Sequence, residues 1–251
     1  MWLKKLITSL LNIFLFILLS YPCAWATPTE PQIAIIIDDL GFNYHNGLRA
    51  VKLPGEVTYA ILPHSPYGTN LATQAHNKGK EIMLHLPMQA IANISPGPGT
   101  LNTQMQKEEF LIELRSNLSS VPYITGLNNH MGSLLTQKAT PMNWLMDELK
   151  ERNLFFVDSR TSHCTVAEHI AQTNGIPSTH RDVFLDNKQD IEYIHHQFVR
   201  LLLLAKRRGN AVAIAHPYPA TLYYLEYALP KLAKHGFKLV SASALIPTYH
   251  G

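Results

Sequence analysis

Hydrophobic residues along this chain form short continuous runs, and a polar or charged residue directly follows most of these runs. The clearest run extends from Ile33 to Ile37, and Asp38, Asp39 and Gly41 come after it. Runs at 57–62, 81–84, 123–127, 154–157 and 211–215 are similar, a weaker one spans 176–186, and a short last one covers 238–240. Continuous apolar runs of this length are typical of strands that are buried on both faces of a parallel sheet.

Helical patterns separate these runs. Apolar spacing and glycine positions predict helices at 66–78, 140–152, 165–174, 190–208 and 222–234, and another whose buried face is Phe110, Leu111, Leu114 and Leu118. Thr103-x-x-Gln106 resembles a capping box at the start of this last helix. The segment 92–102 contains two prolines and two glycines and is expected to be a loop that covers part of the molecule.

The alternation of strands and helices continues without a break in composition. Such a pattern predicts one α/β domain with a mainly parallel sheet, either open or closed into a barrel. In folds of this kind the carboxyl ends of the strands form the binding face. Polar residues that follow the apolar runs are therefore the first candidates for a functional site.

The first 26 residues differ from everything after them. Lys4 and Lys5 precede an apolar run at 10–19, and Ala24-Trp25-Ala26 ends the segment. A basic start, a short apolar core and an Ala-x-Ala site are the features of a secretory signal. We therefore expect a signal peptide at 1–26, a single domain at 27–251 and a periplasmic or secreted location, with an uncleaved membrane anchor as the alternative.

Charge and cysteine content narrow the function further. Cleavage would remove two of the 21 Lys and Arg residues and lower the formal net charge from +3 to +1. A nearly neutral chain without a Lys/Arg run does not have the many cations that a nucleic-acid backbone requires. Only Cys164 would remain after cleavage, so no intrachain disulfide is expected even in an oxidising compartment.

Several of the predicted strands end in groups that bind metals or transfer protons. They are Asp38 with Asp39, His85, His130, Asp158 with Arg160, and His216. One polar residue after a strand means little, but several at the same topological position are expected to meet at one rim. Two adjacent acids also repel each other unless a cation, an arginine or a shared proton offsets the repulsion. The alternative for the acids is a solvated acidic turn.

Imidazole nitrogens together with a carboxylate and an open position are the ligand set of catalytic zinc and related divalent cations. One of the two acids would bind the cation while the other accepts a proton from the activated water. His216, on a different strand, would then protonate the leaving group. This division of roles predicts a metal-assisted hydrolase.

Five motifs in the same order resemble those of the divergent polysaccharide deacetylase family, a distant branch of the NodB-type carbohydrate esterases. They are Ile-Asp-Asp-Leu-Gly at 37–41, Met-Leu-His-Leu-Pro-Met at 83–88, Gly-Leu-Asn-Asn-His-Met-Gly-Ser at 126–133, Phe-Val-Asp-Ser-Arg-Thr-Ser at 156–162 and Ile-Ala-His-Pro-Tyr-Pro-Ala-Thr at 214–221. The resemblance implies a distorted (β/α) barrel over 27–251 with mainly parallel strands. It also implies a divalent metal, most often Zn²⁺, and removal of acetyl groups from a polysaccharide.

The resemblance assigns roles to particular residues. Asp38 resembles the catalytic base, and Asp39 and His85 resemble metal ligands. His216 resembles the catalytic acid, and Asp158 the acid that tunes this histidine. The arginine that steadies the base corresponds to Arg160 or Arg181.

One position departs from the family pattern. The standard enzymes have a second metal-binding histidine four residues after the first, and here that position is Gln89. We expect His130, from the neighbouring strand, to supply the missing nitrogen beside Asp39 and His85. Without His130 the metal site would be incomplete. Gln89 therefore also supports an alternative, a protein that keeps the barrel without turnover.

Three functions remain open at this point. The first is a metal-dependent deacetylase that acts on an acetylated envelope glycan. The second is a protein that binds glycans or assists envelope assembly on the same barrel without turnover. A metal-dependent phosphoesterase is less well supported, because the chain has no glycine-rich phosphate loop and little positive charge near the motifs.

Overall fold

A parallel sheet organises residues 30–246, the part of the chain that the computed structural model describes. The order of its strands is β6-β5-β4-β3-β2-β1-β8-β7, and β9 pairs with β1 outside this sequence. The strands are β1 Gln32–Leu40, β2 Thr58–Ile61, β3 Ile82–Met88, β4 Gly126–Met131, β5 Phe155–Asp158, β6 Ser178–His180, β7 Val183–Phe184, β8 Asn210–Ala215 and β9 Lys238–Leu239. Every pairing between them is parallel.

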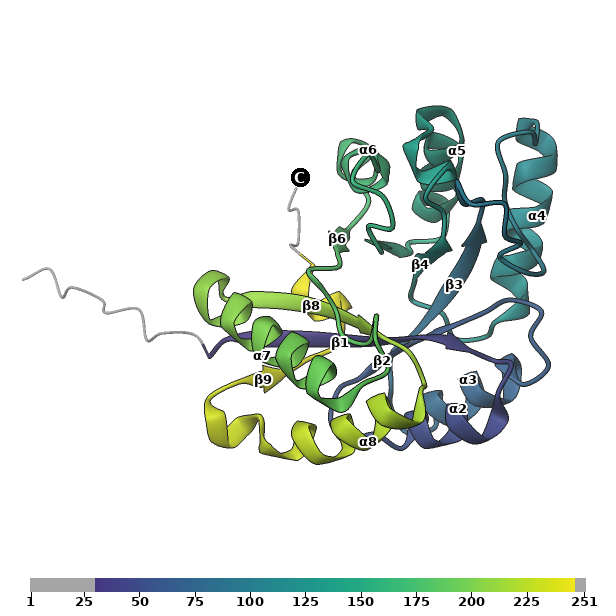
Figure 1. Cartoon of the computed structure of the whole chain (residues 1–251). Helices are drawn as coiled ribbons and strands as arrows, with labels where there is room; N and C mark the ends of the chain where they lie inside the picture. The colour runs from purple at the N-terminus through teal and green to yellow at the C-terminus, as the bar shows by residue number, and fades with distance from the viewer. Residues whose placement is uncertain (1–29, 247–251) are drawn as a thin grey trace, which may run out of the picture.

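The sheet curls, and helices cover its outer side (Figure 1). They are α2 Tyr44–Val51, α3 Gly68–His76, α4 Lys107–Ser120, α5 Ala139–Glu151, α6 Ala167–Thr173, α7 Ile191–Arg208 and α8 Pro219–Ala228. The predicted α/β barrel with mainly parallel strands is therefore confirmed. The signal peptide predicted at 1–26 lies outside the described residues.

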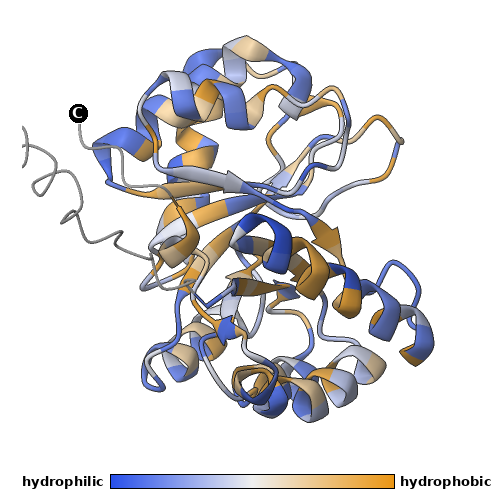
Figure 2. Cartoon of the chain, turned by 90° about the vertical axis from the view of Figure 1, so that its left-hand side faces the viewer, coloured by the Kyte–Doolittle hydropathy of each residue, from blue (hydrophilic) through white to orange (hydrophobic). Residues whose placement is uncertain are grey.

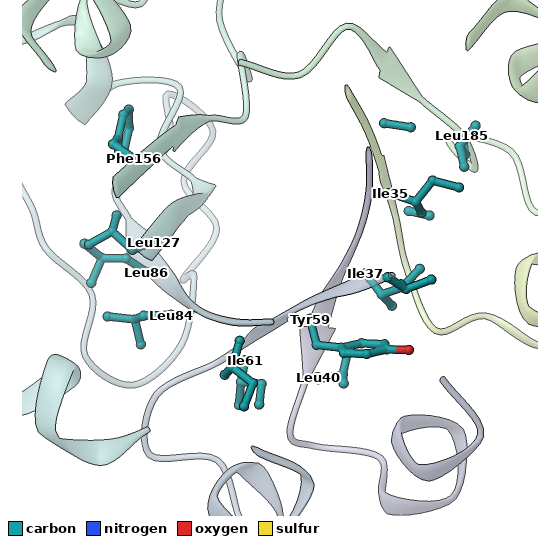
Figure 3. Packing of buried hydrophobic residues seen from close by; sticks show 14 of the residues in the cluster. Ile35, Ile37, Leu40, Tyr59, Ile61, Leu84, Leu86, Leu127, Phe156 and Leu185 are labelled. Atoms are coloured by element: carbon teal, nitrogen blue, oxygen red, sulfur yellow. The ribbon is translucent and has the colours of Figure 1, made fainter. Parts of the chain in front are cut away.

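Alternate residues of each strand enter two different hydrophobic cores. Ile33, Ile35 and Ile37 of β1 pack in the larger core, which includes residues of the surrounding helices. Ala34 and Ile36 belong to the smaller core, which consists of strand residues and residues of the segment 240–246 on the concave side of the sheet. Figure 3 shows side chains of the larger core following the curve of the sheet. Because side chains alternate between the two faces of a strand, position 38 is on the same, concave side as Ala34 and Ile36.

The helices need only one apolar face, since the other is exposed to water. Figure 2 shows hydrophobic colour along the central strands and mixed colour along the helices around them. Helix α7 is capped at its start by Asp190, whose side chain accepts a hydrogen bond from the Tyr193 amide, and at its end by Gly209 with φ 89°. Both ends agree with the prediction for 190–208, because a side-chain cap and a left-handed glycine are the usual termini of a helix.

The two outermost strands of the sheet are almost consecutive in the sequence. β6 pairs with β5 at one end of the sheet and β7 pairs with β8 at the other. The amide of Arg181 donates to the carbonyl of Asp158 beside β6, while the amide of the next residue, Asp182, donates to Val212 in β8. We call this place, where the chain crosses from one edge of the sheet to the other at 181–182, the seam.

Some predicted elements differ from the structure. The weak strand at 176–186 is two short strands on opposite edges of the sheet, because the chain crosses the seam between them. The helix α2 was not predicted, and the helix expected at 222–234 ends at Ala228 and continues in short 3₁₀ turns. The predicted capping box is wrong, because α4 has no side-chain cap and Thr103 binds Gln89 instead.

Within residues 30–246, none of the helices combines the length and the apolar character that crossing a membrane would require.

Candidate metal centre and active site

The concave-side positions of the strands change from apolar to polar near their carboxyl ends. In β1, Asp38 comes two residues after Ile36, and in β3, His85 comes two residues after Met83. In β8, His216 follows the concave-side residue Ile214 by the same interval. The alternation of side chains therefore brings these groups to one end of the concave face.

An irregularity in β1 allows both acids to reach this place. Neighbouring residues of a regular strand point to opposite faces, so Asp38 and Asp39 would normally diverge. The register of β1 with β2 shifts between Ile37 and Leu40, and Asp39 has a φ of 58°. Both carboxylates consequently face His85, with Asp38 Oδ2 at 3.6 Å and Asp39 Oδ1 at 3.1 Å from its Nε2. A left-handed conformation outside glycine costs of order 1–3 kcal/mol and is typical of functional sites.

The structure brings the three predicted metal ligands together. His130 Nδ1 lies 3.0 Å from Asp39 Oδ1 and 3.0 Å from His85 Nε2. One ligand atom from each residue lies within 4.8 Å of the other two. We call Asp39, His85 and His130 the open cluster. Two imidazole nitrogens and a carboxylate oxygen, with further coordination positions open, are a ligand set for catalytic zinc.

Two observations support the fit of a divalent cation to the open cluster. Asp39 Oδ1 is buried, and among the described residues it accepts no hydrogen bond with acceptable geometry. A buried charged acceptor without a donor is costly unless something else compensates it. Burial would raise the pKa of Asp39, but His130 and His85 outweigh this effect and hold the pKa well below its usual range. Asp39 is therefore a carboxylate, the form that binds a metal ion.

Asn128 of β4 fixes the orientation of two of these residues. Its Nδ2 donates to Asp38 Oδ1 at 2.8 Å, so its Oδ1 is left to accept from His85 Nδ1 at 2.7 Å. His85 Nδ1 must then carry the proton, and Nε2 faces the open cluster. This is the arrangement of a metal-binding histidine whose second nitrogen is held by a neighbouring acceptor.

Asp38 lies beside the open cluster and is almost fully buried. Burial raises the pKa of Asp38, and the nearby His85 and His216 oppose the increase without cancelling it. A carboxylate with a raised pKa binds a proton more readily than an exposed one does. The position and the chemistry of Asp38 both agree with its predicted role as a base.

His216 completes the same end of the concave face. Its Nε2 lies 3.7 Å from Asp39 Oδ2, and its Nδ1 donates to Asp186 Oδ1 at 2.9 Å. Asp186 Oδ2 accepts from the His216 amide at 2.7 Å and from Thr221 Oγ1 at 2.8 Å. Burial alone would lower the pKa of His216, but the hydrogen bond and the charge of Asp186 raise it overall. Nε2 is the nitrogen directed at the site.

The predicted role of Asp158 is therefore wrong, because the acid that holds His216 is Asp186. Asp158 follows Phe156, which packs in the helix-side core, and its carboxylate lies on that side of the sheet. It accepts from the Arg160 amide at 2.8 Å, from Thr165 Oγ1 at 2.8 Å and from the Glu168 amide at 3.3 Å. Asp158 thus stabilises the loop after β5 and the start of α6.

The two candidate arginines also have other partners. The Arg160 guanidinium pairs with Glu168 Oε2 at 2.8 Å. Arg181 donates to the backbone carbonyls of Ser159 at 2.7 Å and Arg160 at 2.8 Å. The side chain that donates directly to Asp38 is Asn128, while Arg181 acts on Asp38 only through its charge.

Gln89, at the position of the missing histidine, has a structural role. Its Oε1 accepts from the amide and from the hydroxyl of Thr103, both at 2.9 Å. Its backbone carbonyl accepts from the amides of Leu134 and Leu135. Gln89 therefore connects the end of β3 to the loops on either side, and His130 occupies the place beside His85.

Sequence reasoning missed Asn128 and Asp186. Asn128 carried a usable signal, because it precedes His130 by two residues and therefore shares its face of the strand. Asp186 lies in the segment expected to be one weak strand. Its position next to His216 depends on the pairing of β7 with β8, which no local pattern indicates.

Comparisons with known proteins identify the family of the chain. Residues 35–246 match the family model described as divergent polysaccharide deacetylase. The chain is 39% identical to YibQ of Escherichia coli K12 over 215 residues, which cover 86% of this chain and 67% of that protein.

Solved structures share the fold. ATU2773 from Agrobacterium tumefaciens C58 has a TM-score of 0.83 at 24% identity, covering 89% of this chain and 92% of that one. The catalytic domain of peptidoglycan N-acetylglucosamine deacetylase from Eubacterium rectale gives 0.59 at 13% identity, with 92% and 98% covered. BA3943 of Bacillus anthracis, a CE4 family pseudoenzyme, gives 0.53 at 12% identity, with 87% and 66% covered. At these identities the likeness extends to the fold alone.

Proposed function

The chain belongs to the divergent polysaccharide deacetylase family, and from that premise we propose that it is a metal-dependent hydrolase that removes acetyl groups from an envelope polysaccharide. The observation that carries the proposal is the convergence of Asp39, His85 and His130 within 4.8 Å beside a buried Asp38. These residues come from different strands, and a solvated acidic turn would not need such an arrangement.

Asp39, His85 and His130 would hold the divalent cation, with Zn²⁺ the best match to two imidazoles and one carboxylate. A cation bound there supplies Lewis-acid polarisation of the acetyl carbonyl and lowers the pKa of a coordinated water. Asn128 keeps Nε2 of His85 directed at this place, because it accepts the proton of the opposite ring nitrogen. The buried side-chain amide of Asn128 therefore orients both His85, a proposed metal ligand, and Asp38, the proposed base.

Asp38 accepts the proton of the attacking water, and Asn128 holds its carboxylate in position. His216 donates a proton from Nε2 to the departing amine or alkoxide, so that the leaving group departs neutral. Asp186 keeps the other ring nitrogen protonated and fixes the plane of the imidazole. The base and the acid stand on neighbouring strands, β1 and the end of β8, and can act on the same acetyl group.

Acetate release from an N-acetylglucosamine oligosaccharide, an O-acetylated polysaccharide and isolated peptidoglycan tests the proposal, together with the metal content of the purified protein. Chelation is expected to abolish release and added Zn²⁺ to restore it. Asp38→Asn, which keeps the shape of the side chain, should lower release about 10²- to 10⁴-fold while the metal stays bound. Release that is unchanged by chelation and by Asp38→Asn would refute the mechanism.

The second candidate is a glycan-binding or envelope-assembly protein that uses the same barrel without turnover. It is favoured by the engagement of Gln89 with Thr103, which removes that position from metal binding, and by the fold likeness to a pseudoenzyme. Carbohydrate binding by a stable protein that carries no metal and releases no acetate from any of the three substrates would support this candidate over the first.

Residues 1–26 belong to the proposal as a secretory signal, with the mature protein in the periplasm or outside the cell. The mass of the protein purified from a periplasmic extract tests this part. A mass that corresponds to a chain beginning at Thr27 is expected, and a full-length chain in the membrane fraction would contradict it.

A further inference from the structure

A cavity of about 610 Å³ lies at the seam, apart from the open cluster. Its walls come from the loop after β5, from α6, from residues 181–187 and from α7. We call it the seam cavity; the lining residues that matter here are Arg160, Arg181, Phe184, Tyr193, Gln197 and Arg200. Its volume is in the range of sites that hold a small organic ligand such as a sugar unit.

The acids in the wall of the seam cavity are already compensated. Asp158 is fully buried and accepts from backbone and hydroxyl donors. Glu168 pairs with Arg160 at 2.8 Å and with His180 at 2.6 Å. Asp182 pairs with Arg208 at 3.0 Å and accepts from the Val212 amide at 2.9 Å. Cations therefore pair with Glu168 and Asp182, whereas Asp158 is satisfied by neutral donors and keeps its charge.

Two guanidinium groups in the same wall are not compensated in this way. Within residues 30–246, neither Arg181 nor Arg200 has a carboxylate oxygen within 4.0 Å. Arg181 donates only to backbone carbonyls, and Arg200 has Gln197 Oε1 at 3.5 Å. Burial lowers the pKa of Arg181, the charges of Asp38 and Asp158 oppose this effect without cancelling it, and the charges of Arg160 and Arg200 add to it. Two cations facing one cavity attract an anion, and a guanidinium matches a carboxylate in shape.

The seam cavity adjoins the active site through one aromatic residue. The Arg181 guanidinium carbon lies 5.2 Å from the centre of the Phe184 ring, and the centre of this ring lies 5.0 Å from that of His216. A group in the cavity would therefore be separated from the catalytic imidazole by about one side chain. This spacing suits two neighbouring units of one polymer, one in the cavity and one beside the open cluster.

We propose that the seam cavity binds the carboxylate of an acidic sugar unit through Arg181 and Arg200, so that the polysaccharide deacetylated next to it is anionic. The inference deepens the proposed function, and it rests on that function for the statement that the neighbouring unit is deacetylated. Phe184 and Tyr193 offer aromatic surface for a sugar ring, and Gln197 and Asn187 offer polar groups for its hydroxyls.

The test measures binding rather than turnover, so that it stays independent of the deacetylase activity. The purified protein is titrated by calorimetry with a trigalacturonate, with the same trisaccharide after reduction of its carboxylates to alcohols, and with inorganic phosphate. We expect the acidic trisaccharide to bind at least about tenfold more tightly than the reduced one. The preference for the acidic trisaccharide should decrease as the salt concentration is raised, because Arg200 is exposed to solvent and salt screens its charge.

Arg200→Gln should weaken binding of the acidic trisaccharide about tenfold or more and leave the reduced one unchanged. Arg207→Gln is the matched control, because it removes the same charge from the same helix outside the lining of the cavity. Equal binding of the two trisaccharides, binding of phosphate alone, or no effect of Arg200→Gln would overturn the assignment. Loss of acetate release with the acid preference intact would instead count against the proposed function alone.

Discussion

Two polar clusters at the carboxyl ends of the strands contain similar residues and differ in how their acids are satisfied. The open cluster has Asp39 between His85 and His130, and Asp39 Oδ1 accepts no well-aligned hydrogen bond from the described residues. The other cluster, which we call the closed corner, consists of Asp158, Arg160, Glu168 and His180. Each carboxylate oxygen there meets a donor or a cation.

The difference shows that an acid beside an imidazole is not sufficient evidence for a metal site. In the closed corner the donors come from the chain itself, so a cation would have to displace them and would gain little. In the open cluster the chain supplies acceptors and lone pairs that converge without enough donors. A divalent cation would satisfy such an arrangement.

The largest effect is expected at the open cluster. Asp39→Asn removes the charge of the proposed ligand and leaves the shape of the side chain nearly unchanged. We expect metal affinity to fall by more than about 100-fold, because loss of even a supporting contact costs about 10- to 100-fold. Metal content after dialysis against a weak chelator measures this effect. Asp158→Asn serves as the control, and equal metal content in the two variants would remove the distinction between the clusters.

A smaller loss of activity is expected from the acid that holds His216. The carboxylate of Asp186 accepts hydrogen bonds from three donors. In Asp186→Asn, one oxygen is replaced by an NH₂ group, whose protons must then face at least one of these donors. Acetate release should fall about 10- to 100-fold with metal content unchanged. Kinetic assays at saturating substrate, beside a metal analysis, check both parts. A normal rate would show that His216 does not need Asp186 as its partner.

In the closed corner the same kind of substitution should change stability instead of chemistry. Asp158→Asn loses a charged acceptor that holds the loop after β5 and the start of α6. The free energy of unfolding is expected to decrease by about 1–3 kcal/mol, while acetate release per folded molecule stays within a few-fold of normal. Urea denaturation and a rate measurement on the same preparation separate the two effects. A loss of activity in fully folded protein would assign Asp158 to the active site after all.

The smallest effect concerns pH. The pKa of His180 is raised to about 9 by Asp182 and Glu168, so the folded state holds its proton more tightly than the unfolded state does. This contribution to stability is complete below about pH 6.5 and is lost as the pH rises through about 9. The gain is small, because the His180 side chain is 27% exposed and solvent screens it.

Unfolding free energies at pH 6 and pH 9.5 test this prediction, with His180→Gln as the comparison. The unfolding free energy of the native chain should be lower at pH 9.5 than at pH 6, and this difference should be smaller in the variant. An identical pH dependence in both proteins would mean that the charge on His180 does not stabilise the closed corner.

The sequence was sufficient to predict the sheet, its parallel strands and the group of residues at its carboxyl end. The run from Ile33 to Ile37 can only be buried on both faces, which requires helices on one side and a second core on the other. His85 comes after the apolar run 81–84, and His130 comes after the next run, 123–127. Because these runs form neighbouring parallel strands, both histidines lie at the same edge of the sheet. Their roles as ligands remain predictions, which the geometry supports.

The sequence could not indicate which face each polar residue would occupy at a strand end. Asp158 and Asp38 both come at the end of an apolar run. Asp158, however, is on the same face of its strand as Phe156, which packs in the helix-side core, and it therefore points toward α6. Asp39 reached the site only because β1 is irregular, and such an irregularity has no reliable local signal. Both outcomes depend on the register between strands, which is set by packing across the whole sheet.

Local patterns thus determined the strands, the helices and the chemistry available at one rim, because burial and hydrogen bonding constrain each segment on its own. Tertiary structure decided the partners. Asp186 meets His216, and Arg181 lines the seam cavity, because the chain crosses the seam and its next strand pairs with the far edge of the sheet. Contacts of this kind join residues that are distant in sequence, and only the closure of the whole sheet brings them within reach.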